Sequence, residues 1–190
     1  MAGFEIVAFA ASAGGLHALT EVLASLPADF PAGIVVVQHV DRRHRSLMAE
    51  ILARRTGLRV NEAREGARVT PGSVFIAPSD RHLLVNSDTS LSLTQTELVH
   101  FVRPSADLLF ESTAASYRER AIAVVLSGTG TDGAMGVKAI KKVGGTVIVQ
   151  DQKTSEFFGM PEAAQLTGAA DFVLALEEIG PALQKLVSAE

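Results

Sequence analysis

The sequence predicts an α/β protein: a doubly wound, mainly parallel sheet flanked by helices, with an antiparallel hairpin at the sheet edge. Short apolar runs alternate with amphipathic stretches of helical period along most of the 190 residues, as in chains built from βα units. Turns containing glycine or proline separate these stretches. After residue 72 the pattern changes to three short apolar segments, of which the last two flank a turn at 86–88 and predict the hairpin.

The first third of the chain predicts strands and helices in alternation. In order, these are a strand at 4–10, a helix at 14–26, a strand at 33–37, a helix at 46–56 and a strand at 58–62. Apolar residues that recur three and four positions apart mark the buried face of a helix. The residues expected to face the core are Leu16, Leu19, Leu23 and Leu26 in the first helix and Leu47, Ile51 and Leu52 in the second.

The rest of the chain continues the same alternation after the three short strands. The predicted segments are strands at 73–77, 82–85 and 91–94, a helix from Pro104, a strand at 121–127, a helix at 133–143, a strand at 146–150, a helix at 161–166, a strand at 171–174 and a helix at 177–187. Pro104 is expected to be the first helical residue, where its fixed φ is suited to a helix start. With no internal repeat and no low-complexity linker, the whole of 1–190 is predicted to be a single domain.

Composition narrows the class of protein. A net charge of −4 gives no reason to expect nucleic-acid binding, and no apolar run approaches the ~20 residues that a membrane span needs. The sequence contains no cysteine, which excludes disulfides, a thiolate nucleophile and a cysteine metal site. We therefore expect a cytoplasmic protein without membrane insertion.

Three short motifs follow three predicted strands. Ser12 lies in A-S-A-G-G after the first strand, His39 closes V-V-V-Q-H after the second, and Asp132 lies in S-G-T-G-T-D-G-A after the strand at 121–127. Because parallel strands end at one shared edge of a sheet, these side chains are expected to meet there. A serine, an imidazole and a carboxylate are the groups needed for nucleophilic acyl transfer.

Each of these residues also has a purely structural interpretation. Ser12 resembles a helix N-cap, His39 a hydrogen-bonded core group, and Asp132 a cap for the helix that starts at Gly133. Other residues compete less well for the same roles: Asp41, Asp107 and Asp151 for the acid, and His17, His44, His82 and His100 for the base. The glycines after Ser12 raise the alternative of a nucleotide-binding domain, but G-x-G-x-x-G is not present.

A group of arginines follows His39. It comprises Arg42, Arg43, Arg45, Arg54 and Arg55. The simpler interpretation is a solvated helix face. The functional one is an electrostatic guide for an acidic protein substrate.

Six motifs in order make the chain resemble the catalytic domain of the bacterial chemotaxis receptor methylesterases, the protein-glutamate methylesterase/protein-glutamine glutaminase family. They are A-S-A-G-G, V-V-V-Q-H, V-F-I-A-P-S-D-R-H-L-L, R-P-S-A-D-L-L-F, L-S-G-T-G-T-D-G-A and G-M-P, and they extend over essentially the whole chain. The resemblance implies a serine hydrolase in which Ser12 is the nucleophile, His39 the base and Asp132 the acid. It implies no metal and no organic cofactor. The substrate implied is the methylated cytoplasmic domain of a chemoreceptor.

The chain differs from the family pattern in two places. Family members usually carry a receiver domain, which we do not expect within 1–190, and Thr129 stands where methionine is common. G-T-G is similar to domains fused to receptor methyltransferases, so a methyltransferase or a regulatory protein is a further expected partner. The alternative function is a catalytically weak signalling module of the same fold.

Oxyanion and substrate-binding groups are expected close to the three motifs. A tetrahedral intermediate needs hydrogen-bond donors aimed at its oxygen. The backbone amide of Thr129 is the first candidate, together with an amide from Ala13 or Gly14 at the helix start. Met160, in the G-M-P motif, is a further candidate for substrate binding.

Overall fold

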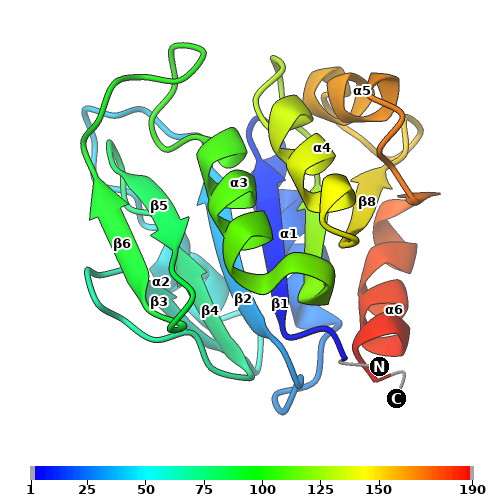
Figure 1. Ribbon diagram of the computed structural model, residues 1–190, viewed down its shortest axis with the longest axis horizontal. Helices are drawn as coiled ribbons and strands as arrows, with labels where there is room; N and C mark the ends of the chain where they lie inside the picture. Colours follow the sequence, from blue (N-terminus) through cyan, green and yellow to red (C-terminus); the bar gives the residue numbers. More distant parts are fainter. Residues whose placement is uncertain (1–2, 189–190) are drawn as a thin grey trace.

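A seven-stranded parallel sheet forms the centre of the protein in the computed structural model, which describes residues 3–188 (Figure 1). The strands are β1 (Ile6–Ala11), β2 (Gly33–Gln38), β3 (Arg59–Glu62), β4 (Ser73–Ile76), β7 (Ala121–Val125), β8 (Thr146–Gln150) and β9 (Phe172–Leu174). Their order across the sheet is β3-β4-β2-β1-β7-β8-β9. The predicted fold class is therefore confirmed, with β1 at the centre.

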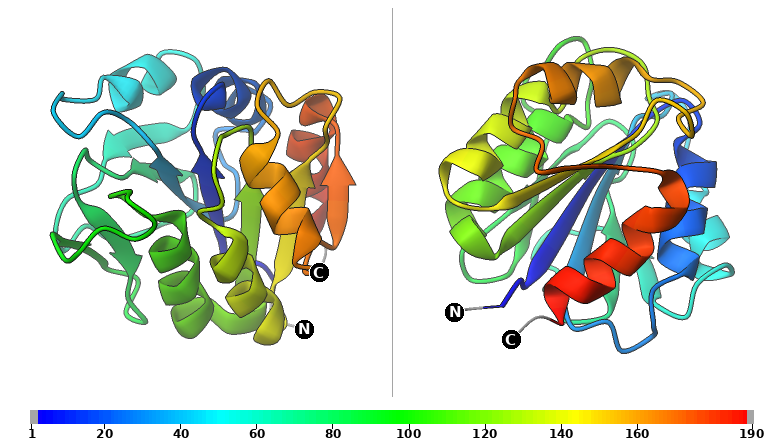
Figure 2. Two further views of the ribbon diagram at one scale, coloured as in Figure 1. Left: turned by 90° about the horizontal axis from the view of Figure 1, so that it is seen from above. Right: turned by 90° about the vertical axis from the view of Figure 1, so that its right-hand side faces the viewer.

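Helices cover both faces of the sheet, giving three layers (Figure 2). One face carries α1 (Gly15–Ala24), α2 (Met48–Ala53) and α6 (Leu176–Val187). The other carries α3 (Ala106–Tyr117), α4 (Ala134–Lys142) and α5 (Gly159–Leu166), with a short 3-10 turn at Arg118–Arg120 after α3. None of the described helices is long and apolar enough to cross a membrane.

The continuous apolar runs of the sequence result from burial on both sides of the sheet. In β1, Ile6, Ala8 and Ala10 pack into the core under α3, α4 and α5. Val7 and Phe9 alternate with them and pack into the core under α1, α2 and α6. Since β1 is buried on both faces, the residues that follow it emerge at the carboxyl edge in a fixed position.

The predicted hairpin is present and forms a two-stranded sheet of its own. β5 (His82–Val85) pairs antiparallel with β6 (Leu91–Thr94). Leu83, Val85 and Leu91 extend the core on the α3 face. The hairpin lies beside α3 (Figure 1) and so shields the first turn of that helix, which becomes important at the site.

Three of the predicted core positions are wrong. Leu16 is 36% exposed, Leu47 58% and Ile51 38%. The helix α2 begins only at Met48, so Leu47 lies outside it as the N-cap residue and the buried face is that of Met48, Ala49 and Leu52. Leu16 lies in the first turn of α1, at the carboxyl edge of the sheet, where solvent reaches it.

The start of α3 also differs from the prediction. The helix begins at Ala106, and Ser105 is its N-cap. The Ser105 hydroxyl accepts the amide of Leu108 at 3.4 Å, which satisfies a donor that the first turn leaves unpaired. Pro104 therefore precedes the cap instead of being the first helical residue.

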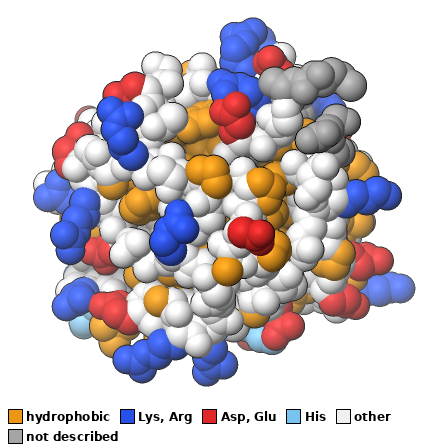
Figure 3. Space-filling model, turned by 90° about the horizontal axis from the view of Figure 1, so that it is seen from below, with side chains coloured by type: hydrophobic (Ala, Val, Ile, Leu, Met, Phe, Trp, Pro, Cys, Tyr) orange, Lys and Arg blue, Asp and Glu red, His pale blue; other side chains and the backbone are white. Residues whose placement is uncertain are grey.

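The described part of the chain, residues 3–188, begins and ends on the side where the strands begin (Figure 1). Seen from that side, basic and acidic side chains are intermixed with apolar groups (Figure 3). The opposite side, where the parallel strands end, carries the three motifs. That edge is where open α/β sheets place ligands.

Candidate active site

Ser12 and His39 directly follow the ends of two neighbouring strands, β1 and β2, and so lie next to each other. Ala11 of β1 is paired with Gln38 of β2 in the parallel register, so the next residues start one strand spacing apart, about 4.8 Å. The Ser12 amide donates to Ser127 O at 3.0 Å and the His39 amide donates to Ala11 O at 3.0 Å. Each of the two residues is therefore held in position by a backbone hydrogen bond to the neighbouring segment of the sheet, Ser12 to the end of β7 and His39 to the end of β1.

The buried side chain of Gln38 links these two residues. Its Nε2 donates to Ser12 O at 2.7 Å and to His39 O at 3.1 Å. Gly15 lies directly over this amide, and a Cβ at position 15 would collide with Gln38 Oε1. Gln38 belongs to one of the sequence motifs, but its role cannot be predicted from the sequence, because periodicity and motif order carry no information about contacts between strands.

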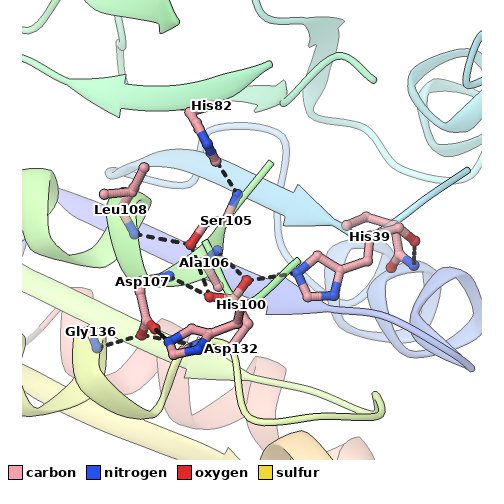
Figure 4. A network of polar contacts seen from close by, with 11 residues as sticks. His39, His82, His100, Ser105, Ala106, Asp107, Leu108, Asp132 and Gly136 are labelled. Carbon is pink, nitrogen blue, oxygen red and sulfur yellow. Dashed lines mark hydrogen bonds and ion pairs between the residues drawn. The ribbon is translucent and has the colours of Figure 1, made fainter. Parts of the chain in front are cut away.

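His39 and Asp132 are in direct contact (Figure 4). His39 Nε2 lies 2.7 Å from Asp132 Oδ2, and the two side chains are 13% and 3% exposed. The other ring nitrogen, Nδ1, makes no hydrogen bond to a described residue, so no hydrogen bond links His39 to the Ser12 hydroxyl in this structure. The structure thus brings a carboxylate that follows β7 onto the imidazole that follows β2, across the end of β1.

Asp132 accepts four hydrogen bonds. Oδ1 accepts from the Ser105 hydroxyl at 2.9 Å and the Asp107 amide at 3.0 Å; Oδ2 accepts from the Ala106 amide at 2.6 Å and from His39. Burial acts to raise the pKa of Asp132, but the bonds from His39 and the two amides outweigh it and hold that pKa below its usual value. Asp132 is therefore ionised at neutral pH.

These bonds revise the structural interpretation of Asp132. The sequence indicated a cap for the helix that begins after Gly133. In the structure Asp132 contacts the amides of α3 instead, and Gly133 caps α4 without a side-chain bond. A helix N-terminus stabilises a carboxylate there, so the capping and the contact with His39 are made by the same group.

Asp107 caps the helix α4 in return. Its Oδ1 accepts the amides of Gly133 at 3.0 Å and Gly136 at 2.7 Å. Its Oδ2 has no hydrogen bond of good geometry within the described chain, although His100 Nε2 approaches it to 3.4 Å. Burial raises the pKa of Asp107 above its usual value, and the nearby charge of Asp132 acts in the same direction.

The other competing acids are engaged elsewhere. Asp41 is exposed and bound to Arg43 in its own loop. Asp151 accepts the amide and hydroxyl of Thr154 at the end of β8. Of the four aspartates considered from the sequence, Asp132 is the one that contacts His39.

His82 supports the site from behind, a role that the sequence does not predict. The ring is fully buried; Nδ1 accepts the Ser105 amide at 3.1 Å and Nε2 donates to Glu97 O at 2.8 Å. This pattern specifies the neutral tautomer. A chain of contacts thus leads from the hairpin residue His82 through Ser105 to Asp132 (Figure 4).

The turn before α1 and the loop after β7 lie against each other at Ser12. Within the described chain, the amides of Ala13, Gly14 and Thr129 donate to no protein acceptor. The Ser127 hydroxyl donates to Ala13 O at 2.8 Å, which joins the loop after β7 to the turn before α1. The three amides proposed from the sequence for the oxyanion thus remain available as donors.

Met160 lies behind this loop. Its side chain is buried, its amide donates to Gly128 O at 2.9 Å, and a Cβ on Gly128 would come within 2.5 Å of its sulfur. The same Cβ would lie 2.8 Å from Ser12 Cβ. Met160 and Gly128 therefore pack closely behind Ser12.

The arginines after His39 are not a uniform group. Arg43 binds Asp41 with Nη2–Oδ2 at 3.0 Å, and Arg45 binds Glu50 at 2.7 Å. Arg42 only approaches Asp80, at 3.8 Å. Arg54 and Arg55 are exposed after α2.

Fold and polar cluster together define a class: an open parallel α/β protein with a serine, an imidazole–carboxylate pair and free amides at the carboxyl edge of its sheet. Within that class the chain belongs to the CheB methylesterase family, whose family model matches residues 7–183. The chain is also similar to the solved Thermotoga maritima CheB methylesterase catalytic domain, with a TM-score of 0.93 and 38% identity over 98% of this chain and 100% of that one.

Curated relatives carry the same family name. A Burkholderia lata protein-glutamate methylesterase/protein-glutamine glutaminase is 46% identical over 178 residues, which are 94% of this chain and 52% of that protein. A putative protein of that name from Leptospira interrogans is 39% identical over 93% of this chain and 91% of its own length. A Moorella thermoacetica relative is 41% identical, with 45% of its length covered. The chain thus spans about half the length of several relatives it matches.

Proposed function

We propose that the chain is a protein-glutamate methylesterase, a serine hydrolase that removes methyl esters from glutamate side chains of chemotaxis receptors. The observation that carries this proposal is the contact of His39 Nε2 with Asp132 Oδ2 at 2.7 Å, beside the strand end that holds Ser12. The names of the relatives support a glutamate methyl ester on a protein as the substrate, and the receptor as that protein follows from the resemblance of the sequence motifs.

His39 is assigned the role of general base. In this proposal the Ser12 oxygen attacks the ester carbonyl while His39 accepts the serine proton at Nδ1, the nitrogen that Asp132 does not occupy. Asp132 accepts the hydrogen bond from Nε2–H, fixes the tautomer and stabilises the imidazolium. The lowered pKa of Asp132 supports this role, because only the ionised carboxylate stabilises a positive ring.

The oxyanion is assigned to backbone donors. The amides of Ala13, Gly14 and Thr129 have no acceptor within the described chain and flank Ser12 from the start of α1 and from the loop after β7. Donors fixed by the fold need no reorganisation during the reaction. Met160 contributes by holding Gly128, and hence this loop, against Ser12.

Ester cleavage and deamidation would share one acyl-enzyme. Methanol leaves when the substrate is a methyl ester, and ammonia leaves when it is a glutamine amide. His39 then activates water to release glutamate from Ser12. The second activity rests on the glutaminase in the relatives' names, and the order of steps rests on general acid–base chemistry.

Methanol release from a glutamate-methylated receptor cytoplasmic fragment tests the proposal. The wild-type chain should release methanol and Ser12→Ala should not, while Ser87→Ala, which removes an exposed hydroxyl at the hairpin turn, should behave as wild type. Wild-type turnover by Ser12→Ala would contradict the assignment of Ser12 as nucleophile, and no turnover by any of the three would contradict the function.

A further inference from the structure

We infer that a hollow beside His39 is a subsite for a carboxylate of the substrate protein, close to the esterified glutamate, and that Arg42 recognises that carboxylate. The hollow is about 180 Å³, and the residues that line it include His39, Asp41, Arg42, Phe101, Arg103 and Pro104. His39 belongs to its wall, so a ligand there is adjacent to the reacting ester. The ester part of this inference rests on the proposed function.

Among the described arginines around the hollow, ion pairing leaves one guanidinium without a close carboxylate of its own. Asp41 is engaged by Arg43 through both carboxylate oxygens, at 3.1 and 3.0 Å. Asp80 accepts Nε and Nη2 of Arg103 at 2.9 and 2.7 Å. Three guanidinium groups therefore face two carboxylates, and the third guanidinium is that of Arg42.

Arg42 is held more loosely than the other two arginines. Its Nη1 lies 3.8 Å from Asp80 Oδ1, an oxygen that already accepts two bonds from Arg103, and 45% of its side chain is exposed. Arg103 is 17% exposed and also donates to Thr96 O at 2.8 Å. Arg103 and Asp80 thus form a fixed wall, while Arg42 keeps donors free for a ligand.

Phe101 supplies an apolar side to the same hollow. It is 90% exposed, and both His100 and Phe101 have left-handed backbone φ, 47° and 66°, a costly conformation that is enriched at functional sites. An exposed aromatic ring beside an arginine is suited to a side chain with methylene groups and a terminal anion. A glutamate or aspartate side chain has that composition.

A carboxylate fits the electrostatics better than a phosphate. Arg42 offers one loosely paired positive charge to a single negative charge, and the carboxylates of Asp41, Asp80 and, behind His39, Asp132 would repel a doubly charged group more strongly. The arginine fork binds a carboxylate with two parallel hydrogen bonds. The subsite would therefore select methylated glutamates that have an acidic neighbour.

The experiment compares two enzymes and two substrates. The substrates are methylated receptor fragments in which acidic residues within one helical turn of the ester are either intact or changed to alanine; alanine is used because a glutamine would itself be a deamidation substrate. The enzymes are wild type and Arg42→Gln, with Arg45→Gln as matched control, since Arg45 lies in the same loop but is paired with Glu50, and neither of these two residues lines the hollow. Both kcat/KM for methanol release and binding affinity are measured.

We expect wild type to prefer the acidic fragment by about two- to fivefold in kcat/KM, the range for a half-exposed ion pair. Arg42→Gln should remove that preference, through KM, and Arg45→Gln should retain it. A preference that persists in Arg42→Gln, or is lost equally in Arg45→Gln, would overturn the subsite. If wild type binds the acidic fragment preferentially but releases no methanol, the subsite stands and the esterase proposal fails.

Discussion

Asp107 and Asp132 cap each other's helices: Asp132 caps α3, which contains Asp107, and Asp107 caps α4, which begins just after Asp132. Asp132 precedes α4 yet accepts the amides of Ala106 and Asp107 at the start of α3, while Asp107 in α3 accepts the amides of Gly133 and Gly136 at the start of α4. The two carboxylates thus bind the first turns of both helices together. The position of the acid that contacts His39 is therefore set by the junction of two helices.

This exchange predicts opposite results for two substitutions of Asp107. Asp107→Ala leaves two buried helix amides unpaired and should lower the free energy of unfolding by about 2–4 kcal/mol. Asp107→Asn retains an oxygen for Gly133 and Gly136 and removes a buried charge, so it should be at least as stable as wild type at neutral pH. Chemical denaturation checks both variants.

The pH dependence of Asp107→Asn follows from the raised pKa of Asp107. A carboxyl whose pKa is raised on folding costs stability as pH rises from the unfolded pKa, about 3.9, through the folded one. The advantage of the Asn variant should therefore be largest at neutral pH and disappear in acid. A constant difference at all pH values would mean that Asp107 is not a destabilising charge.

Asp132→Asn should lose both activity and stability. All four groups that contact the carboxylate oxygens are donors, so an NH2 group at either position would face a donor and cost about 1–3 kcal/mol. The rate should fall about 10⁴-fold, as in other triads. Because the pKa of Asp132 is lowered on folding, its stabilisation is present above about pH 4 and is lost as pH falls through the folded pKa. The stability gap between wild type and variant should therefore narrow in acid, and a fully active Asn variant would assign the acid role elsewhere.

Gln38 should affect catalysis without touching substrate. Gln38→Met keeps the side-chain volume but removes the amide that donates to both Ser12 O and His39 O. The variant therefore has no side chain that bridges these two residues. We expect kcat to fall with little change in KM. Gln150→Met is the matched control for a buried glutamine, since it binds Ser127 and Thr154 instead. Equal effects in both variants would indicate general destabilisation.

Two substitutions of Thr129 test whether its backbone amide is an oxyanion donor. Its side chain is exposed, so Thr129→Met should retain activity, whereas Thr129→Pro removes the amide and should reduce kcat by roughly 10²–10³. A structure of the proline variant is the control for distortion of the loop. An undistorted, fully active Thr129→Pro would exclude this amide from the oxyanion hole.

The sequence predicted the fold class and the edge of the sheet where Ser12, His39 and Asp132 lie, because strand order along the chain and burial leave strong periodic signals. Prediction from the sequence failed where contacts between residues distant in sequence determine the structure or the role of a residue. Leu47 carried the helical pattern but lies outside α2, and His82 and Gln38 are identified only by contacts with residues distant in sequence or on a neighbouring strand. The division of the arginines into paired and unpaired likewise depends on loop geometry that period and motif do not encode.

The central claim is that Ser12 is the nucleophile activated by His39 and Asp132. Labelling of the wild-type chain with a serine-directed fluorophosphonate, followed by peptide mass mapping, tests it most directly. The account predicts a single adduct on Ser12, at a rate that falls by orders of magnitude in His39→Ala. An adduct on another serine, or methanol release that continues after complete labelling of Ser12, would contradict it.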